Sequence, residues 1–334
     1  MSAAVDVVTD TRSSLAETIG DWTRRNRWTL GLIALLIGFL AFTRLIGPGY
    51  GAPELQNLAI GALPISFSAV AQAIVVISGG IDLSVGSMMA LTSVTSAVLM
   101  KDQGEGFAVA VVIGVLLLGL ACGAINGSII VITRVPDIVV TLAMSFVWAG
   151  ATLLVLASPG GGAADWVKGL INGSIGSEWV PRALVVLVVV VGVVWIPLRR
   201  SVLGLSLYAL GSDRLAAFRS GVAVGRTKII AYSLTGLFCA LGGLAVTAST
   251  GSGSPVPGAY TLQSVAAIVL GGVSLAGGRG GILGPILAVF ILQLVRTDLT
   301  FLEVNPNFST VVQGVILIGV VLLGSVLAMR RVRR

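Results

Sequence analysis

Residues 55–100 read LQNLAIGALPISFSAVAQAIVVISGGIDLSVGSMMALTSVTSAVLM and contain one charged residue, Asp82. A helix needs about 20 apolar residues to cross the hydrocarbon core of a bilayer. The stretch is therefore long enough for two spans, which we place at residues 55–81 and 83–100. Glycine and serine cluster where these spans meet, around Asp82, and such clusters mark turns. The stretch thus predicts two membrane-spanning helices joined by a short turn.

The rest of the chain has the same character. Of its 334 residues, 56% are hydrophobic and only 10% are charged, with a mean hydropathy of +1.02. A soluble domain carries about 25% charged residues, so this composition requires a bilayer. The remaining uncharged runs are residues 28–43, 106–133, 138–164, 183–198, 229–278, 280–295 and 304–329. The breaker cluster 251–258 divides the run 229–278 in two, which predicts an all-α polytopic membrane protein of about ten transmembrane helices.

The distribution of basic residues predicts the orientation. With both termini in the cytoplasm, five of the 21 basic residues fall outside, and the rest follow the rule that lysine and arginine concentrate in cytoplasmic loops. We divide the chain into a cytoplasmic lead-in (1–27), a transmembrane domain (28–329) with a cytoplasmic loop at 199–228, and a basic tail (330–334). The basic residues are dispersed among the loops, so nucleic-acid binding is not predicted. The five outer ones are Arg44, Lys101, Lys168, Arg182 and Arg296.

Several kinds of chemistry are excluded by residue types that the chain lacks. It has no histidine, the side chain most used for acid–base catalysis and metal binding near neutral pH. Its two cysteines, Cys122 and Cys239, lie far apart in apolar runs and are expected to be packed thiols. No phosphate-binding GxxxxGK[ST] motif occurs. We predict no catalytic residues, no metal site and no cofactor bound by this chain.

The turn around Asp82 is the first functional candidate. Asp82 suits the start of the following helix, where a carboxylate meets unpaired backbone amides. A gating or proton-coupling role is the alternative, although an isolated acid makes a poor proton relay. A second glycine cluster, residues 271–281, repeats the pattern Gly-Gly-x-x-Leu and gives weak support for a duplicated half. The candidate residues of the first turn are Gly79, Gly80, Asp82, Leu83, Ser84 and Gly86.

The loop 199–228 contains the second candidate, a short helix that Ser212 or Asp213 would cap and Gly221 would end. Two adjacent alanines make this helix slim enough to enter the groove of another protein. A solvated helix without a partner and a docking helix for a soluble subunit are equally compatible with the composition. The candidate residues are Gly211, Ser212, Asp213, Arg214, Ala216, Ala217, Arg219, Ser220 and Gly221.

Polar side chains within the apolar spans are candidates for a solute path, because buried polar groups in a membrane face a partner or a water-filled cavity. Hydrogen bonding between helices is the alternative for each. The candidates are Asn57, Gln72, Asn126, Ser145, Gln263, Gln293 and Gln313. The outer segment 158–182 could carry a short surface helix, which the sequence leaves undecided.

The two candidate segments resemble the ribose-type permease family of bacterial ABC sugar importers. The family's most specific motif is matched by Gly79-Gly80-Ile81-Asp82-Leu83-Ser84-Val85-Gly86-Ser87. The loop helix is similar to its coupling segment, with two mild changes, Asp213 for Asn and Val222 for Ile. Further matches are Val135-Pro136, Val140-Thr141-Leu142, Tyr232-Ser233-Leu234-Thr235-Gly236-Leu237 and Gly271-Gly272-Val273-Ser274-Leu275. The resemblance runs from about residue 57 to 324.

The resemblance implies a multi-pass subunit of the bacterial inner membrane that pairs with a second permease subunit, identical or different. A periplasmic sugar-binding protein would deliver a monosaccharide or similar small polar solute. Cytoplasmic ATPase subunits would bind ATP and Mg and act on the helix around 212–221. The alternatives are an ion-coupled secondary transporter and, less favoured because acids are not clustered, a membrane-embedded enzyme. A polyol, a nucleoside or a sugar derivative would suit the same spans.

One residue departs from the family pattern. Asp137 stands where relatives usually have a small or aromatic residue. It follows Arg134 closely in the sequence, and we predict an ion pair between these two side chains.

Overall fold

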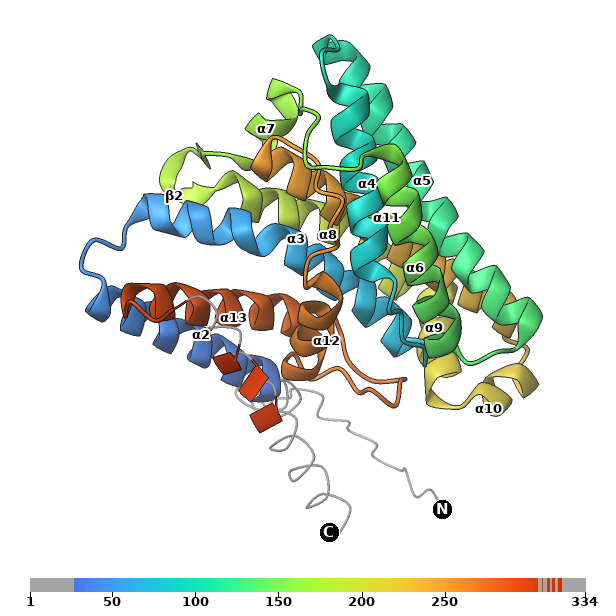
Figure 1. Cartoon of the computed structure of the whole chain (residues 1–334). Helices are drawn as coiled ribbons and strands as arrows, with labels where there is room; N and C mark the ends of the chain where they lie inside the picture. The colour runs from blue at the N-terminus through green and yellow to red at the C-terminus, as the bar shows by residue number, and fades with distance from the viewer. Residues whose placement is uncertain (1–26, 306–307, 309–310, 313, 316–317, 320–334) are drawn as a thin grey trace, which may run out of the picture.

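The computed structural model describes residues 27–305, 308, 311–312, 314–315 and 318–319. The predicted lead-in 1–27, apart from Arg27, and the tail 330–334 lie outside these residues, as do most of the predicted span 304–329 and Gln313. The described chain folds almost entirely into helices (Figure 1). In order, its elements are α2 (Arg27–Ile46), α3 (Ala52–Ile77), α4 (Val85–Met100), α5 (Glu105–Thr133), α6 (Asp137–Val155), α7 (Asp165–Ile171), β1 (Ser174–Ile175), β2 (Ser177–Pro181), α8 (Arg182–Arg200), α9 (Val202–Ser212), α10 (Arg214–Arg219), α11 (Val224–Thr250), α12 (Tyr260–Leu270) and α13 (Leu283–Phe301).

Seven of these helices, α2, α3, α5, α6, α8, α11 and α13, are long and apolar enough to cross a membrane. Helices α4 and α12 lie in two further predicted spans but contain only 16 and 11 residues. Glycine clusters on either side of α12 account for its length. Helix α11 ends at Gly251, whose φ is 71°, and α12 ends before Gly272, whose φ is 80°. Glycine adopts this left-handed conformation without strain, so both clusters stop helices as the sequence indicates.

The sequence left undecided whether the outer segment 158–182 carries a short helix, and the structure shows both a helix and a hairpin there. The segment contains the short helix α7 and an antiparallel hairpin of β1 and β2, which pair through Ser174–Pro181 and Ile175–Ser177. This hairpin and an isolated antiparallel bridge between Gly160 and Gly253 depart from an all-α fold in the described chain. In Figure 1, α7 lies at the end of the molecule opposite α10.

The centre of the molecule is the packing of α11 against α5, α3 and α4. Three glycines spaced four residues apart on α5 face α11. A Cβ on Gly119 would overlap Gly236 O, one on Gly123 would overlap Tyr232 O, and one on Gly127 would lie 2.9 Å from the Cα of Ile229. Small residues at this spacing let the backbones of two helices come into direct contact. Both cysteines are buried and free, as predicted.

A second packing unit joins α2 to α13, which run side by side in Figure 1. At the start of α2 the Trp28 indole donates a hydrogen bond to O of Leu270, the last residue of α12, at 3.0 Å. Near the other end of α2, Thr43 Oγ1 lies 2.6 Å from Asp298 Oδ1 of α13. These polar contacts satisfy groups that would otherwise face hydrocarbon.

The contact between α5 and α11 leads to a matched prediction. Replacing Gly123 by alanine places a methyl group where Tyr232 O now lies, whereas a methyl group on Gly114 of the same helix would meet no atom within 4 Å. We expect Gly123→Ala to destabilise the folded protein by about 1–3 kcal/mol, the usual cost of overpacking. Gly114→Ala should have no such effect. Thermal unfolding of the two purified variants in the same detergent tests this, and equal midpoints would contradict the close helix contact.

Candidate functional site

The short helix α10 has the capping predicted from the sequence. Asp213 Oδ1 accepts hydrogen bonds from the backbone amides of Leu215 and Ala216 at 2.8 and 2.9 Å. Asp213, rather than Ser212, is therefore the cap, since Ser212 belongs to the end of α9. At the other end Gly221 has a φ of 84°, and its amide donates to Phe218 O at 3.0 Å. This backbone pattern ends the helix at the glycine, as predicted.

Most of α10 faces outward. Ala217 is its one buried residue, while Arg214, Ala216 and Arg219 are exposed, as are the flanking Ser212 and Ser220. Two large apolar side chains on α10 are also exposed, Leu215 at 57% and Phe218 at 68%. The helix thus exposes apolar and cationic side chains together. Ala217 is the residue through which α10 packs against the rest of the protein.

The end of α9 is enclosed by two glycine-rich loops. A Cβ on Gly211 would overlap Ile77 O and lie 2.6 Å from Gly278 N, and a Cβ on Gly277 would lie 3.0 Å from the Cα of Gly79. The Gly278 amide donates to Ile77 O at 3.0 Å, and Tyr208 Oη donates to Gly280 O at 2.8 Å. We call the contact of Gly79, Gly211, Gly277 and Gly278 the glycine junction. It brings together the two clusters that share the Gly-Gly-x-x-Leu pattern, with the start of the α9–α10 turn between them.

The turn from α3 to α4, residues 78–84, forms the Asp82 loop. Asp82 is fully buried, and its Oδ1 accepts hydrogen bonds from Ser84 N at 2.8 Å and Ser84 Oγ at 2.6 Å. Asn126 of α5 donates to Ser84 Oγ at 2.8 Å, and the Trp148 indole of α6 donates to Asn126 Oδ1 at 3.2 Å. Burial raises the pKa of the Asp82 carboxyl to about 6, while the hydrogen bonds from Ser84 act in the opposite direction. Asp82 braces the turn into α4 through Ser84.

Two other residues of the motif also anchor this turn through their backbones. The Leu83 amide donates to Thr141 Oγ1 of α6 at 3.1 Å, and the Gly86 amide donates to Thr261 Oγ1 of α12 at 2.9 Å. A Cβ on Gly86 would lie 2.9 Å from the same Thr261 oxygen. The motif residues therefore connect α4 to three other helices, namely α5, α6 and α12.

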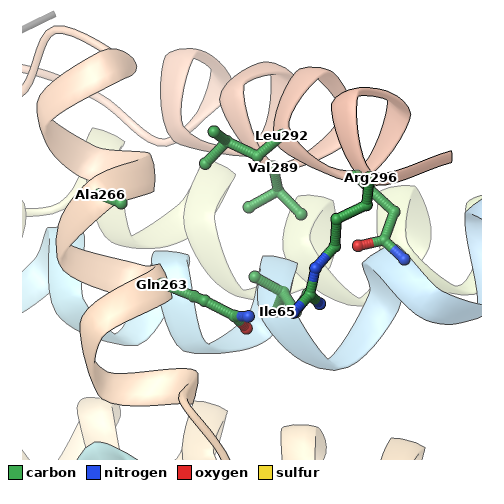
Figure 2. Close-up of a pocket in the computed structure, with 7 residues that line it drawn as sticks. Ile65, Gln263, Ala266, Val289, Leu292 and Arg296 are labelled. Carbon is green, nitrogen blue, oxygen red and sulfur yellow. The ribbon is translucent and has the colours of Figure 1, made fainter. Parts of the chain in front are cut away.

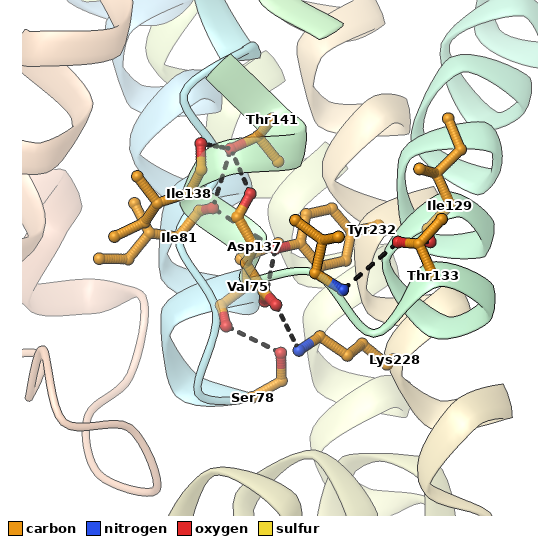
Figure 3. A network of polar contacts seen from close by, with 11 residues as sticks. Val75, Ser78, Ile81, Ile129, Thr133, Asp137, Ile138, Thr141, Lys228 and Tyr232 are labelled. Carbon is orange, nitrogen blue, oxygen red and sulfur yellow. Dashed lines mark hydrogen bonds and ion pairs between the residues drawn. The ribbon is translucent and has the colours of Figure 1, made fainter. Parts of the chain in front are cut away.

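A buried ion pair lies directly beside the Asp82 loop (Figure 3). Lys228 Nζ of α11 is 2.7 Å from Asp137 Oδ1 at the start of α6, and the two side chains are 11% and 13% exposed. Tyr232 Oη donates to Asp137 Oδ2 at 2.8 Å. A Cβ on Gly80 would lie 2.5 Å from Asp137 Oδ2, so a larger residue there would displace the Asp137 carboxylate. We call the contact of Gly80, Asp137, Lys228 and Tyr232 the latch.

The latch corrects one prediction. Asp137 does not pair with Arg134, which is exposed and ends α5 in a left-handed conformation with φ of 58°. The backbone turn after α5 directs Asp137 toward α11 instead, where Lys228 lies 91 residues away in sequence. The closeness of Arg134 and Asp137 in the sequence therefore did not predict the contact between Asp137 and Lys228.

The predicted solute-path residues do not form one set. Asn126 serves the Asp82 loop, Ser145 donates to Leu142 O on its own helix, and Asn57 is exposed on α3. Gln72 is fully buried in α3, and neither side-chain amide atom has a hydrogen-bond partner among the described residues. Gln263 and Gln293, in contrast, line the same pocket (Figure 2).

This pocket lies between α3, α12 and α13 and has a volume of about 40 Å³. Its third polar side chain is Arg296, which the charge pattern had placed in an outer connection. Helix α13 continues to Phe301, beyond the predicted end of the span at residue 295, and so carries Arg296 within it. The walls are apolar and include Ile65, Val289 and Leu292.

Sequence reasoning gave no site role to Lys228 and Trp148, and it named Thr141 and Tyr232 only within segments that match the family. It also did not place Arg296 beside a pocket. The available signal was that no glycine or proline follows Arg296 until Pro306, so nothing in the sequence breaks the helix directly after it. Among the described residues no group of three or more potential metal-binding side chains occurs.

Comparison with known proteins adds a separate observation. Residues 54–321 match the family described as the branched-chain amino acid transport system permease component. The ribose import permease protein RbsC of Escherichia coli K12 is 33% identical over 300 residues, covering 87% of this chain and 91% of that protein. The fructose import permease protein FrcC of Rhizobium meliloti is 32% identical over 296 residues, covering 86% and 82%.

A third relative is named for the import of a different solute. The autoinducer 2 import system permease protein LsrD of Salmonella paratyphi B is 28% identical over 312 residues, covering 89% of this chain and 91% of that protein. No solved structure matches the chain.

The latch can be tested by removing each charge in turn. Lys228→Met leaves a buried carboxylate without its cation, which costs about 3–5 kcal/mol of stability. We expect Lys228→Met and Asp137→Asn each to lower the unfolding midpoint, and the double variant to recover most of the loss. Lys168→Met on α7 is the matched control, because its partner Asp165 lies 2.6 Å away but is exposed, and it should change little. A double variant no more stable than either single variant would refute the pairing.

Proposed function

Because the chain belongs to the ribose-type permease family of ABC importers, we propose that it is the membrane-spanning subunit of an importer for a monosaccharide or related small polar solute. Separate cytoplasmic ATPase subunits, which bind ATP and Mg, drive the transport, and a periplasmic binding protein supplies the solute. Relatives named for ribose, fructose and autoinducer 2 import support a sugar or sugar-like cargo.

The observation that carries this proposal is the exposed face of α10. Leu215 and Phe218 are both more than half exposed on a short helix that also exposes Arg214 and Arg219, and such a mixed apolar and cationic face is suited to docking a soluble partner. The arginines beside them favour an acidic rim on that partner. An ATPase subunit docked there would contact a helix that is connected to the interior of the protein on both sides.

Two connections lead inward from α10. Through the turn at 220–223 the chain passes into α11, whose Lys228 reaches the latch. Through Asp213 it passes back to α9 and the glycine junction, where Gly211 lies against Ile77 and Gly278. Because backbones touch directly at the junction, a displacement of α10 cannot be absorbed by flexible side chains there. Both connections reach the Asp82 loop, and we propose that this loop transmits movement to α4 and α6.

The proposed subunit is a multi-pass protein of the bacterial inner membrane with both termini in the cytoplasm. The excess of lysine and arginine in the connections assigned to the inside supports this orientation. The α9–α10 segment belongs to the loop 199–228, which the charge pattern assigns to the cytoplasm, and both glycine-rich loops lie beside it. A second permease subunit, identical or different, completes the path between two copies.

The docking face of α10 is tested by making it acidic. We expect Leu215→Asp with Phe218→Asp to lower ATP-driven uptake into vesicles, and solute-stimulated ATP hydrolysis, by more than about tenfold, as expected for the loss of a central contact worth about 2 kcal/mol. Both side chains are exposed, so the variant should fold. The control is Leu170→Asp on α7, which is also about half exposed but lies at the opposite end.

Two outcomes would count against the proposal. Uptake that stays coupled to ATP hydrolysis in the acidic α10 variant would refute the docking role. Uptake that proceeds at the full rate without any ATPase subunit, but stops when the ion gradient is removed, would favour an ion-coupled transporter.

A further inference from the structure

Arg296 stands apart from the other charges described above. It lies within α13, one of the helices able to span a membrane, and is only partly exposed. A charged side chain within a spanning helix is costly and normally faces a partner or an aqueous cavity. In Figure 2 the Arg296 side chain extends into the pocket between α12 and α13, toward Ile65 and Gln263.

No carboxylate neutralises this arginine within the part of the chain that the structure describes. The ion pairs found there are Lys168–Asp165 and Lys228–Asp137. Asp298, on the same helix, accepts a hydrogen bond from the Thr43 hydroxyl of α2. The sequence after Glu303 contains no acidic residue, so the C-terminal part of the chain offers no carboxylate side chain either. Neither the described residues nor the sequence after Glu303 therefore supplies a carboxylate paired with Arg296, and a bound group can provide that negative charge.

The pocket offers hydrogen-bond donors suited to oxygen ligands. A guanidinium carries five N–H donors in a planar fork that matches the geometry of carboxylate and phosphate. The Gln263 and Gln293 side chains add amide N–H groups and make no hydrogen bond to another described residue. The surrounding Ile65, Val289 and Leu292 provide apolar walls, which strengthen the attraction between a cation and an anion by excluding water.

The size of the pocket limits what enters it. A volume of about 40 Å³ holds a few water molecules, since a single water needs roughly 10–15 Å³ by the same measure. A carboxylate or phosphate group fits this space. The pocket is therefore suited to one charged group of a larger molecule.

We propose that Gln263, Gln293 and Arg296 form a subsite for an oxyanion, a carboxylate or phosphate group. This inference rests on the proposed transport function in one respect: the carried solute, a sugar acid or sugar phosphate, supplies the group. A lipid phosphate has the same chemistry and is the other possible source. The experiment therefore separates the soluble ligand from the lipid.

The test is ligand-induced stabilisation of the assembled transporter, which does not depend on ATP hydrolysis. Glucuronate, glucose 6-phosphate and neutral glucose are titrated against the complex in neutral-lipid nanodiscs, and the unfolding midpoint of the permease is followed. We expect both acidic ligands to bind more tightly than glucose. Arg296→Gln should weaken their binding by about 10- to 100-fold, as for the loss of a charged hydrogen bond, and leave the response to glucose unchanged.

Three further measurements make the result decisive. Arg44→Gln is the control, because Arg44 is an exposed arginine of α2 stacked near Trp179 at 6.0 Å and lies outside the pocket, and it should bind as the wild type does. Arg296→Gln without ligand should be at least as stable as the wild type, since an unpaired charge is removed and no ion pair is lost. The same titrations are repeated in discs containing phosphatidylglycerol.

The possible results distinguish a lipid-bound site, the absence of a subsite and a failure of the transport proposal. Stabilisation by phosphatidylglycerol alone, lost in Arg296→Gln, supports the oxyanion site and assigns its occupant to the lipid, which overturns the solute as its source. Equal binding of glucose and glucuronate in wild type and Arg296→Gln overturns the subsite altogether. Failure of the transport proposal would instead appear as uptake that needs no ATPase and leaves these binding results unaffected.

Discussion

In a bilayer a polar or charged side chain has to find its partner inside the protein, and this constraint shapes the whole molecule. The Asp137–Lys228 pair shows its effect most clearly, because each charge is buried and only the other can neutralise it. The pair holds the start of α6 against α11 at one definite position. Tyr232 and Gly80 complete that arrangement, so the turn between α3 and α4 is fixed at the same point.

Close backbone contact is the second constraint, and it follows from the first. Hydrocarbon gives helices no hydrophobic reason to associate, so they pack by direct contact at small residues. Glycines of α5 bring it against α11, and the glycine junction brings α9 against two loops. Rigid contacts of this kind connect the exposed helix α10 to the buried latch. A partner that moves α10 would therefore shift the interior as well.

The sequence predicted the parts of this account that depend on local chemistry. The apolar helices, the breaker cluster after α11 and the end of α10 at Gly221 follow from residue types at short range, whereas only seven of the ten predicted spans are matched by described helices long and apolar enough to cross a membrane. For the cap of α10 the sequence offered Ser212 or Asp213, and the structure selects Asp213. The sequence did not predict contacts between distant segments. Nothing near Asp137 in the sequence indicates Lys228 as its partner, and the predicted partner, Arg134, was wrong. Arg296 was placed in a connection between spans because a charge was taken as the end of a span, whereas α13 continues past it to Phe301.

The same reasoning explains the divided set of polar residues. Asn126 has a structural role because two neighbours, Ser84 and Trp148, satisfy both ends of its amide. Gln263 and Gln293 lie beside a pocket, and within the described chain their amides remain available to another molecule. Residue type alone could not separate these cases, since all three are uncharged amides in apolar helices.

The most direct test of the central claim is to find what touches α10. A photoreactive amino acid is placed at Ala216, which is exposed, or at Leu170 on α7, and the assembled transporter is irradiated in vesicles. The account predicts that position 216 cross-links to the ATPase subunit and position 170 does not. A cross-link to the ATPase from position 170, or none from position 216, would contradict it.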